Sequence, residues 1–401
     1  MQSDQLPAQS KRQPRLKALL EVIAVSFKLG LTSFGGPVAH LAYFHNEYVQ
    51  RRKWLDERSY ADLVALCQFL PGPASSQVGI GIGIVRAGLW GGLLAWLGFT
   101  LPSVLALLIF ALLLQNGQLA DGGWLHGLKL VAVAIVAQAV LSMGQKLAPD
   151  RSRATIAILA AAVVLLWQTA FAQILVIVLA GLAGLLLYRH AANAEPISLQ
   201  ISVSRSLAVW CIALFFVLLA VLPLVSQYAG LDWLNLFDSF YRVGSLVFGG
   251  GHVVLPLLQQ EVVAVGGISE QTFLAGYGAT QAVPGPLFTI SAYLGYFAQG
   301  FSGAVLATLA IFLPSFLLVI GALPFWNALR SSAKVQAALA GINAAVVGIL
   351  LAALYDPLWK TTIMAPIDFV FAAILFVLLV FWKLPSWVVV LAGAAGGLLF
   401  L

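Results

Sequence analysis

The sequence predicts an all-α polytopic membrane protein, in which two inverted-topology repeats with discontinuous or re-entrant helices supply roughly 9–13 membrane segments. The first observation is composition: of 401 residues, 61% are hydrophobic and 9% are charged, whereas a soluble domain has about 25% charged residues. Second, apolar stretches long enough to cross about 30 Å of hydrocarbon recur along the chain. Third, one set of Gly- and Pro-containing motifs occurs twice within the apolar sequence.

Continuous apolar runs mark the candidate spans. They cover residues 92–114, 124–145, 154–169, 171–188, 206–226, 304–325, 335–354, 363–382 and 385–401. Because the runs do not alternate with polar residues, they favour helices and exclude a transmembrane β-barrel. The net charge of +6 lies in short loops, which argues for membrane orientation and against nucleic-acid binding. Cys67 and Cys211 suggest neither a disulfide nor a metal site.

Ordered matches between the two halves indicate an internal duplication. With Gly30 placed on Gly244, FGG at 34–36 falls on FGG at 248–250. A one-residue gap then places QFLPGP at 68–73 on QAVPGP at 281–286, and a further gap places LPS at 101–103 on LPS at 313–315. We therefore expect a cytoplasmic N-terminal tail (1–15), a first repeat (16–190), a polar loop with a linking transmembrane helix (191–227) and a second repeat (228–401).

The basic loops change places between the repeats. The first half is basic around Arg51 and Arg151, whereas the equivalent loops of the second half hold only Lys360. Conversely, Arg330 and Lys334 fall in a loop whose first-half counterpart, QNGQLADGG, has no positive charge. Positive loops face the cytoplasm, so we expect inverted repeats in the cell membrane, the N-terminus cytoplasmic and the C-terminus outside. A parallel duplication is the alternative.

Two segments in each half are interrupted. Residues 16–50 are broken by SFGGP at 33–37, and their counterpart by VFGGGH at 247–252; residues 59–86 and 272–299 are broken by PGP. Proline ends one helix and suits the first turn of the next, so new helices should begin near Pro73 and Pro286. Their unpaired N–H groups and positive dipole ends favour an anion. Simple proline kinks are the alternative.

Ionisable residues recur near the first break of each half. Lys28 aligns with Arg242, and two cations related by a pseudo-twofold axis would suit a dianion; the alternative is that both extend to the membrane interface. Glu47 aligns with Glu261, and the two acids either pair with these cations or carry a proton. For Glu47 there is an equally open alternative: it is an acid at the end of a loop, and Arg51 or Arg52 neutralises its charge. Gln68 and Gln281 precede the PGP turns and offer hydrogen bonds to freed carbonyls or to a ligand.

These residues carry a family resemblance. The motifs SFGGPVAHL and LCQFLPGPASSQVG, echoed by VFGGGHVVLPLLQQEVV and TQAVPGPLFTISAYLG, resemble the chromate ion transporter family over nearly the whole chain. The resemblance implies a membrane carrier that expels chromate in exchange for protons and so confers chromate resistance. Sulfate or another oxyanion is the alternative substrate, and an intramembrane lipid-phosphate enzyme is a more distant alternative. An ATP-binding motif is absent from the sequence, which favours ion-gradient coupling.

The candidate site residues combine the charge pattern with these motifs. The predicted substrate-binding residues are Lys28, Phe34, Gly35, Gly36, Pro37, Gln68, Pro71, Gly72, Pro73, Ser76, Arg242, Gly249, Gly250, Gln281, Pro284, Gly285, Pro286 and Thr289. The predicted proton-coupling residues are Glu47 and Glu261. We expect no catalytic residue, metal or cofactor. The expected partners are chromate or sulfate, protons and the lipid bilayer, and a homodimer is compatible with the sequence.

Overall fold

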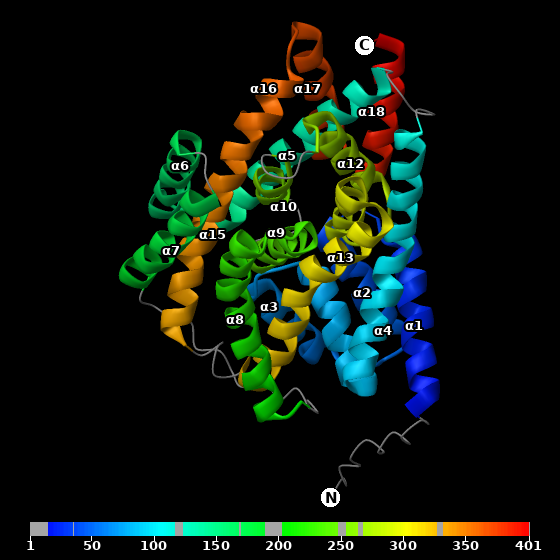
Figure 1. Cartoon of the computed structure of the whole chain (residues 1–401), viewed down its shortest axis with the longest axis vertical. Helices are drawn as coiled ribbons and strands as arrows, with labels where there is room; N and C mark the ends of the chain where they lie inside the picture. Colours follow the sequence, from blue (N-terminus) through cyan, green and yellow to red (C-terminus); the bar gives the residue numbers. More distant parts are fainter. Residues whose placement is uncertain are drawn as a thin grey trace, which may run out of the picture.

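A computed structural model describes residues 15–34, 36–116, 123–167, 170–188, 203–247, 254–263, 268–326 and 332–400 (Figure 1). Within these ranges all regular structure is helical. Five helical stretches there are long and apolar enough to cross a membrane: 74–115, 123–147, 205–229, 287–325 and 333–362. Shorter apolar helices cover 175–187, 366–380 and 386–399. The prediction of an all-α polytopic membrane protein is confirmed.

The two halves contain matching series of helices. The first half consists of α1 (Arg15–Thr32), α2 (Gly36–Phe44), η1 (His45–Arg51), α3 (Glu57–Phe69), α4 (Ala74–Gln115), α5 (Gly123–Leu147), α6 (Arg151–Leu166) and α7 (Ala170–Leu187). Helix α8 (Arg205–Ala229) links the halves. The second half consists of α9 (Asp232–Leu246), α10 (Val254–Leu258), η3 (Gln259–Val263), α12 (Glu270–Ala282), η4 (Leu287–Thr289), α13 (Ile290–Ala322), η5 (Leu323–Phe325), α15 (Ala333–Ala353), η6 (Leu354–Trp359), α16 (Lys360–Thr362), α17 (Pro366–Val380) and α18 (Ser386–Phe400).

Helices α4 and α13 each contain a sharp elbow. In α4 the backbone leaves helical geometry at Ala87 and Gly88, and in α13 it does so at the equivalent Gln299 and Gly300. The chain then folds back on itself, since a Cβ built on Gly83 would meet the carbonyl of Gly91 across the elbow. Each PGP motif is therefore followed by a short helix, an elbow and then a long apolar helix.

The interrupted segments of the first repeat turn back toward the side on which they begin. Glu47 of η1 pairs with Lys28, and Arg52, just after η1, pairs with Glu21, so the chain after the break runs antiparallel to α1. Arg86, beside the α4 elbow, also pairs with Glu21. The elbow thus lies on the same side as the first half of α1, which is the re-entrant arrangement expected for both broken segments.

Equivalent long helices of the two repeats run antiparallel. The ring of Trp96, in the middle of the long part of α4, lies 5.6 Å from that of Phe312 in the middle of the long part of α13, and the ring of Phe110, near the end of α4, stacks on that of Tyr293 near the start of α13. Likewise, Tyr296 near the α13 elbow donates to Gln115 Oε1 at the end of α4, at 2.6 Å. A pseudo-twofold axis in the membrane plane produces this opposite direction, whereas a parallel duplication would leave the two helices parallel.

The last helices of each repeat pack on the other repeat. Helices α6 and α7 lie along α15, and α17 and α18 lie along α5, as Figure 1 shows with α6, α7 and α15 at one side of the molecule. Glycines make these contacts close: a Cβ on Gly127 of α5 would meet the Gly393 carbonyl of α18, and one on Gly341 of α15 would meet the Ala180 carbonyl of α7. Small residues commonly bring membrane helices together. Because each repeat packs its last helices on the other repeat, the two repeats form one body around the interrupted segments.

Candidate functional site

The PGP turns separate helices where the sequence predicts. Helix α3 ends at Phe69 and α4 begins at Ala74, directly after Pro73. In the second repeat α12 ends at Ala282, and one 3₁₀ turn (Leu287–Thr289) precedes α13. The tighter turn forms because both the amide and the hydroxyl of Thr289 donate to the Pro286 carbonyl, at 3.1 and 2.7 Å. The hydroxyl of Thr289 is therefore already engaged with the backbone.

Each PGP turn docks on the break of the other repeat. The amide of Gly72 donates to the Val247 carbonyl at 2.6 Å, and the amide of Gly285 donates to the Ser33 carbonyl at 2.9 Å. Ser33 and Val247 are equivalent residues in the repeat alignment, so the two bonds form one reciprocal pair. Four interruptions that are far apart in the sequence are thereby gathered between the repeats, at the break junction formed by the two PGP turns with Ser33 and Val247.

The LPS serines complete the break junction. Ser103 Oγ donates to the Pro284 carbonyl at 2.5 Å. Its repeat counterpart, Ser315, lies beside the opposite turn, because a Cβ built on Gly72 would be 2.9 Å from Ser315 Oγ. Sequence reasoning used these serines only to align the repeats. Their presence in both LPS motifs was the available signal that they share a role.

Several polar atoms at the break junction are buried and have no hydrogen-bond partner within the described part of the chain. They are Ser33 Oγ, Ser76 Oγ, Gln77 Oε1, Gln281 Nε2 and Ser315 Oγ. The first turn of α4 also starts at Ala74 without a side-chain cap, which leaves helix N-terminal amides available. An uncompensated buried polar group costs about 1–3 kcal/mol, so hydrogen bonds from a polar ligand or water to these atoms would be stabilising.

The other motif residues surround the break junction in different ways. The Pro71 carbonyl accepts from Gln77 Nε2 at 2.6 Å and not from Gln68, whose side chain is exposed. Phe34 is half-buried with its ring 5.9 Å from that of Trp387, while Gly36 and Pro37 open α2. Gly35, Gly249 and Gly250 lie outside the described residues.

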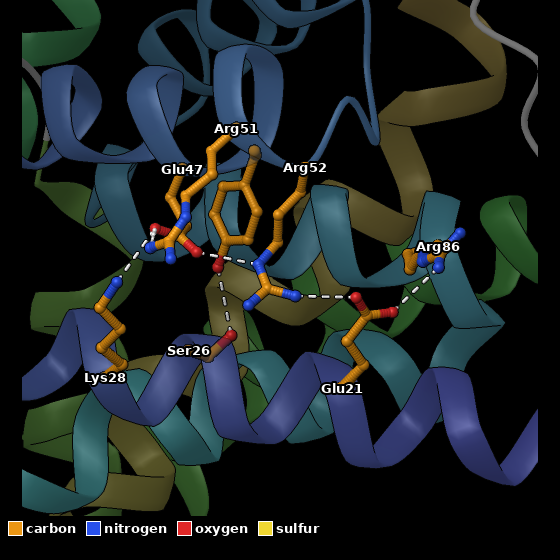
Figure 2. Close-up of polar contacts among 8 residues, drawn as sticks. Glu21, Ser26, Lys28, Glu47, Arg51, Arg52 and Arg86 are labelled. Atoms are coloured by element: carbon orange, nitrogen blue, oxygen red, sulfur yellow. Dashed lines mark hydrogen bonds and ion pairs between the residues drawn. The ribbon is translucent and has the colours of Figure 1, made fainter.

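The basic residue Lys28 belongs to an ion-pair network in the first repeat (Figure 2). Lys28 Nζ lies 3.2 Å from Glu47 Oε2, and Glu47 also accepts from Arg51 and Arg52, at 3.2 and 2.8 Å. Arg52 continues to Glu21 at 2.7 Å, and Glu21 binds Arg86 at 2.9 Å. The Lys28 side chain is half exposed (50%), whereas that of Glu47 is 8% exposed. The network joins α1, the segment after the break and the α4 elbow.

Arg242 forms the equivalent ion pair of the second repeat. Its two terminal nitrogens bind the two oxygens of Glu261, both at 2.8 Å, and it also contacts Asp238 at 2.9 Å. Lys28 and Arg242 thus each face the acid of their own repeat, which is one of the two roles expected for Glu47 and Glu261. Sequence reasoning missed Asp238, although its position four residues before Arg242 on one helix was a usable signal.

Comparisons with known proteins agree with this architecture. Residues 20–185 and 234–398 each match the family described as Chromate transporter. The chain belongs to the chromate transporter family. It is 31% identical over 396 residues to a chromate transport protein of Pseudomonas aeruginosa, covering 95% of this chain and 92% of that one. A chromate transport protein of Cupriavidus metallidurans is 26% identical over 385 residues, covering 94% and 92%.

An uncharacterized transporter of Methanocaldococcus jannaschii is 28% identical over 340 residues, covering 83% of both chains. No solved structure matches the chain. The two separate family matches coincide with the two helical series, so each half of this chromate transporter homologue corresponds to one family unit.

Proposed function

We propose that the chain is a secondary active carrier of a tetrahedral oxyanion, and that it exports chromate in exchange for protons and so confers chromate resistance. The family is one of transporters, and two related chains are named chromate transport proteins. The proposed location is the cell membrane, with the N-terminus in the cytoplasm and the C-terminus outside. Sulfate, a dianion of the same shape, is the expected competitor.

The observation that carries the proposal is the reciprocal docking of the PGP turns. The bonds from Gly72 to Val247 and from Gly285 to Ser33 hold non-helical backbone between the two repeats. Such backbone is tolerated at membrane depth only where protein or water covers it. In inverted-repeat transporters the substrate site lies near mid-membrane at the repeat interface, formed by discontinuous helices. The break junction lies between the repeats and is formed where helices are interrupted, which supports the proposal.

The chemistry of the break junction suits an oxyanion. The uncapped first turn of α4 supplies backbone N–H groups and the positive end of a helix dipole. The hydroxyls of Ser76 and Ser315 are buried and unpartnered in the described structure, so both are free to donate to chromate oxygens. We propose that Pro71, Gly72 and Pro73, with Pro284, Gly285 and Pro286, shape the junction, and that Gln281 adds an amide donor.

The ion pairs are proposed to act beside the break junction. Lys28 and Arg242 would attract the dianion, and Glu47 and Glu261 would take up protons when the cations release them. Phe34, Gly35, Gly36, Pro37, Gln68, Gly249, Gly250 and Thr289 remain proposed substrate-site residues through their motifs. Of these, Thr289 would contribute mainly through the 3₁₀ turn, because its hydroxyl donates to Pro286.

The direct test is chromate flux in proteoliposomes with an imposed pH gradient. We expect flux that follows the gradient and falls when sulfate is added. Ser76→Ala with Ser315→Ala should raise the KM for chromate roughly tenfold, the loss expected for about 1.4 kcal/mol of hydrogen bonding. Ser302→Ala is the matched control, since Ser302 is exposed and bonds only the nearby Gln299 carbonyl, at 3.0 Å. Unchanged flux in the double variant would place the substrate elsewhere.

Proton coupling has its own test. Glu261→Gln should uncouple chromate flux from the pH gradient while flux down a chromate gradient persists. Glu47→Gln, measured in parallel, tests whether both repeats take part. If both variants keep the full response to the pH gradient, neither acid carries the coupled proton.

A further inference from the structure

An open cavity of about 280 Å³ lies in the second repeat, away from the break junction. It is bounded by α9, η3 and the elbow of α13, and its polar lining comprises Asp232, Asn235, Ser239, Glu261 and Gln299. Asp232 and Asn235 are exposed, while Ser239, Glu261 and Gln299 are half-buried. The cavity therefore leads from the surface to the carboxylate of Glu261, and every polar side chain on its wall offers an oxygen.

The charges at this cavity do not balance. Arg242 is shared between Glu261, which lines the cavity, and Asp238, which lies behind it on α9. Asp232 is the second carboxylate on the cavity wall. One oxygen of Asp238, a residue only 3% exposed, has no hydrogen-bond partner within the described ranges. A buried carboxylate oxygen without a donor is costly. The cluster thus carries more negative charge than its single guanidinium neutralises.

In the first repeat, the position equivalent to this cavity is occupied by the side chain of Arg86. The elbows at Ala87–Gly88 and Gln299–Gly300 are equivalent, so Arg86 of the first repeat corresponds to Ala298, a residue on the cavity wall. In the first repeat the guanidinium of Arg86 binds Glu21, the counterpart of Asn235 (Figure 2). The second repeat has neutral residues, Asn235 and Ala298, where the first repeat has this ion pair, and the cavity lies there beside Glu261.

We propose that the cavity binds a small monovalent cation, for which Na⁺ is the probe, in the place that Arg86 occupies in the first repeat. Carboxylate, amide and hydroxyl oxygens are ligands for hard cations. Soft transition metals are disfavoured, because the polar side chains on the cavity wall offer oxygen ligands and neither imidazole nor thiolate. The bound cation would join α9 to the α13 elbow, as the Glu21–Arg86 pair joins α1 to the α4 elbow.

The test is binding of radiolabelled Na⁺ to the full-length purified carrier, with thermal unfolding in NaCl against equal choline chloride. We expect saturable binding and a higher unfolding midpoint in NaCl only. Asp232→Asn should weaken Na⁺ binding about tenfold, as expected for loss of one charged ligand. Asp150→Asn is the control, because Asp150 is an exposed acid that caps α6 through Arg153 N–H, a bond that asparagine retains.

A second variant separates loss of the site from misfolding. Ala298→Arg restores the guanidinium found in the first repeat, so it should abolish Na⁺ binding while its unfolding midpoint without Na⁺ stays at or above that of wild type. Equal stabilisation by NaCl and choline chloride, or undiminished Na⁺ binding in Ala298→Arg, would overturn the proposal. Because these readouts need no chromate, failure of the cation site and failure of the proposed transport function are distinguishable.

Discussion

Alanine at Gly72 or Gly285 tests how tightly the PGP turns dock. Gly72 has φ of 116° and Gly285 has φ of 104°, a region that residues with a Cβ rarely adopt. A Cβ at Gly72 would lie 2.8 Å from Gln77 Nε2 and 2.9 Å from Ser315 Oγ, and a Cβ at Gly285 would meet Ser103 Oγ. Both substitutions therefore combine backbone strain with displacement of a junction side chain.

The expected destabilisation follows from these two contributions. Left-handed backbone with a Cβ costs about 1–2 kcal/mol. Displacing Gln77 from the Pro71 carbonyl, or Ser103 from the Pro284 carbonyl, removes a hydrogen bond with a net value of about 0.5–1.5 kcal/mol. The free energy of unfolding should fall by about 1.5–3.5 kcal/mol in each variant. Gly230→Ala is the control: its φ is 60° at the end of α8 with open space around it, so only the backbone cost of about 1–2 kcal/mol is expected.

The measurement is denaturant unfolding in detergent micelles, accompanied by chromate flux. Gly72→Ala and Gly285→Ala should behave alike, because each turn makes the reciprocal interrepeat bond. They should also reduce flux, whereas Gly230→Ala should retain it. A turn variant that is no less stable than Gly230→Ala would contradict tight reciprocal docking of the PGP turns.

Three further predictions concern single contacts. Ser103→Ala should lower the free energy of unfolding by about 1 kcal/mol through loss of the Pro284 bond, whereas Ser315→Ala, measured in the same assay, should leave it nearly unchanged. A double-mutant cycle of Glu21→Gln and Arg86→Met should give a coupling energy of about 0.5–3 kcal/mol from unfolding curves, and additivity would contradict the pair. The Ser59 amide holds the pKa of Asp56 below its usual range, so the stability from this cap is full above the ordinary pKa and is lost as pH falls through the lowered one. Unfolding curves against pH should show this loss in wild type and not in Asp56→Asn, which caps without a charge.

Local rules predict where the helices break. Proline lacks an N–H and suits a first turn, so a start near Pro73 could be predicted, and the observed start at Ala74 follows it. The same rule placed a start near Pro286, where a 3₁₀ turn intervenes because Thr289 bonds back to Pro286. The proline pattern is the same in both repeats, so it could not predict this difference, which depends on the hydroxyl of Thr289.

The docking partners could not be predicted, because they depend on non-local geometry. The repeat alignment makes Ser33 and Val247 equivalent, but it does not say that each accepts from the PGP glycine of the other repeat. The roles of Lys28 and Arg242 also depended on their surroundings. Both cations are close to an acid of their own repeat, which offsets part of the desolvation cost that an unpaired charge would carry.

The two repeats have similar backbones but different sets of charged side chains, and the two properties affect transport differently. Inverted repeats give the carrier two similar halves, so that similar backbone arrangements are available to either side of the membrane. The network around Lys28 nevertheless joins four cations to two carboxylates, while the cluster around Arg242 joins one cation to two carboxylates beside Asp232. A dianion is therefore attracted more strongly by the first network than by Arg242, whose charge is offset by these carboxylates. Under the proposed function, loading is therefore favoured on the side of the first repeat and release on the side of the second, which is the direction that export from the cytoplasm requires.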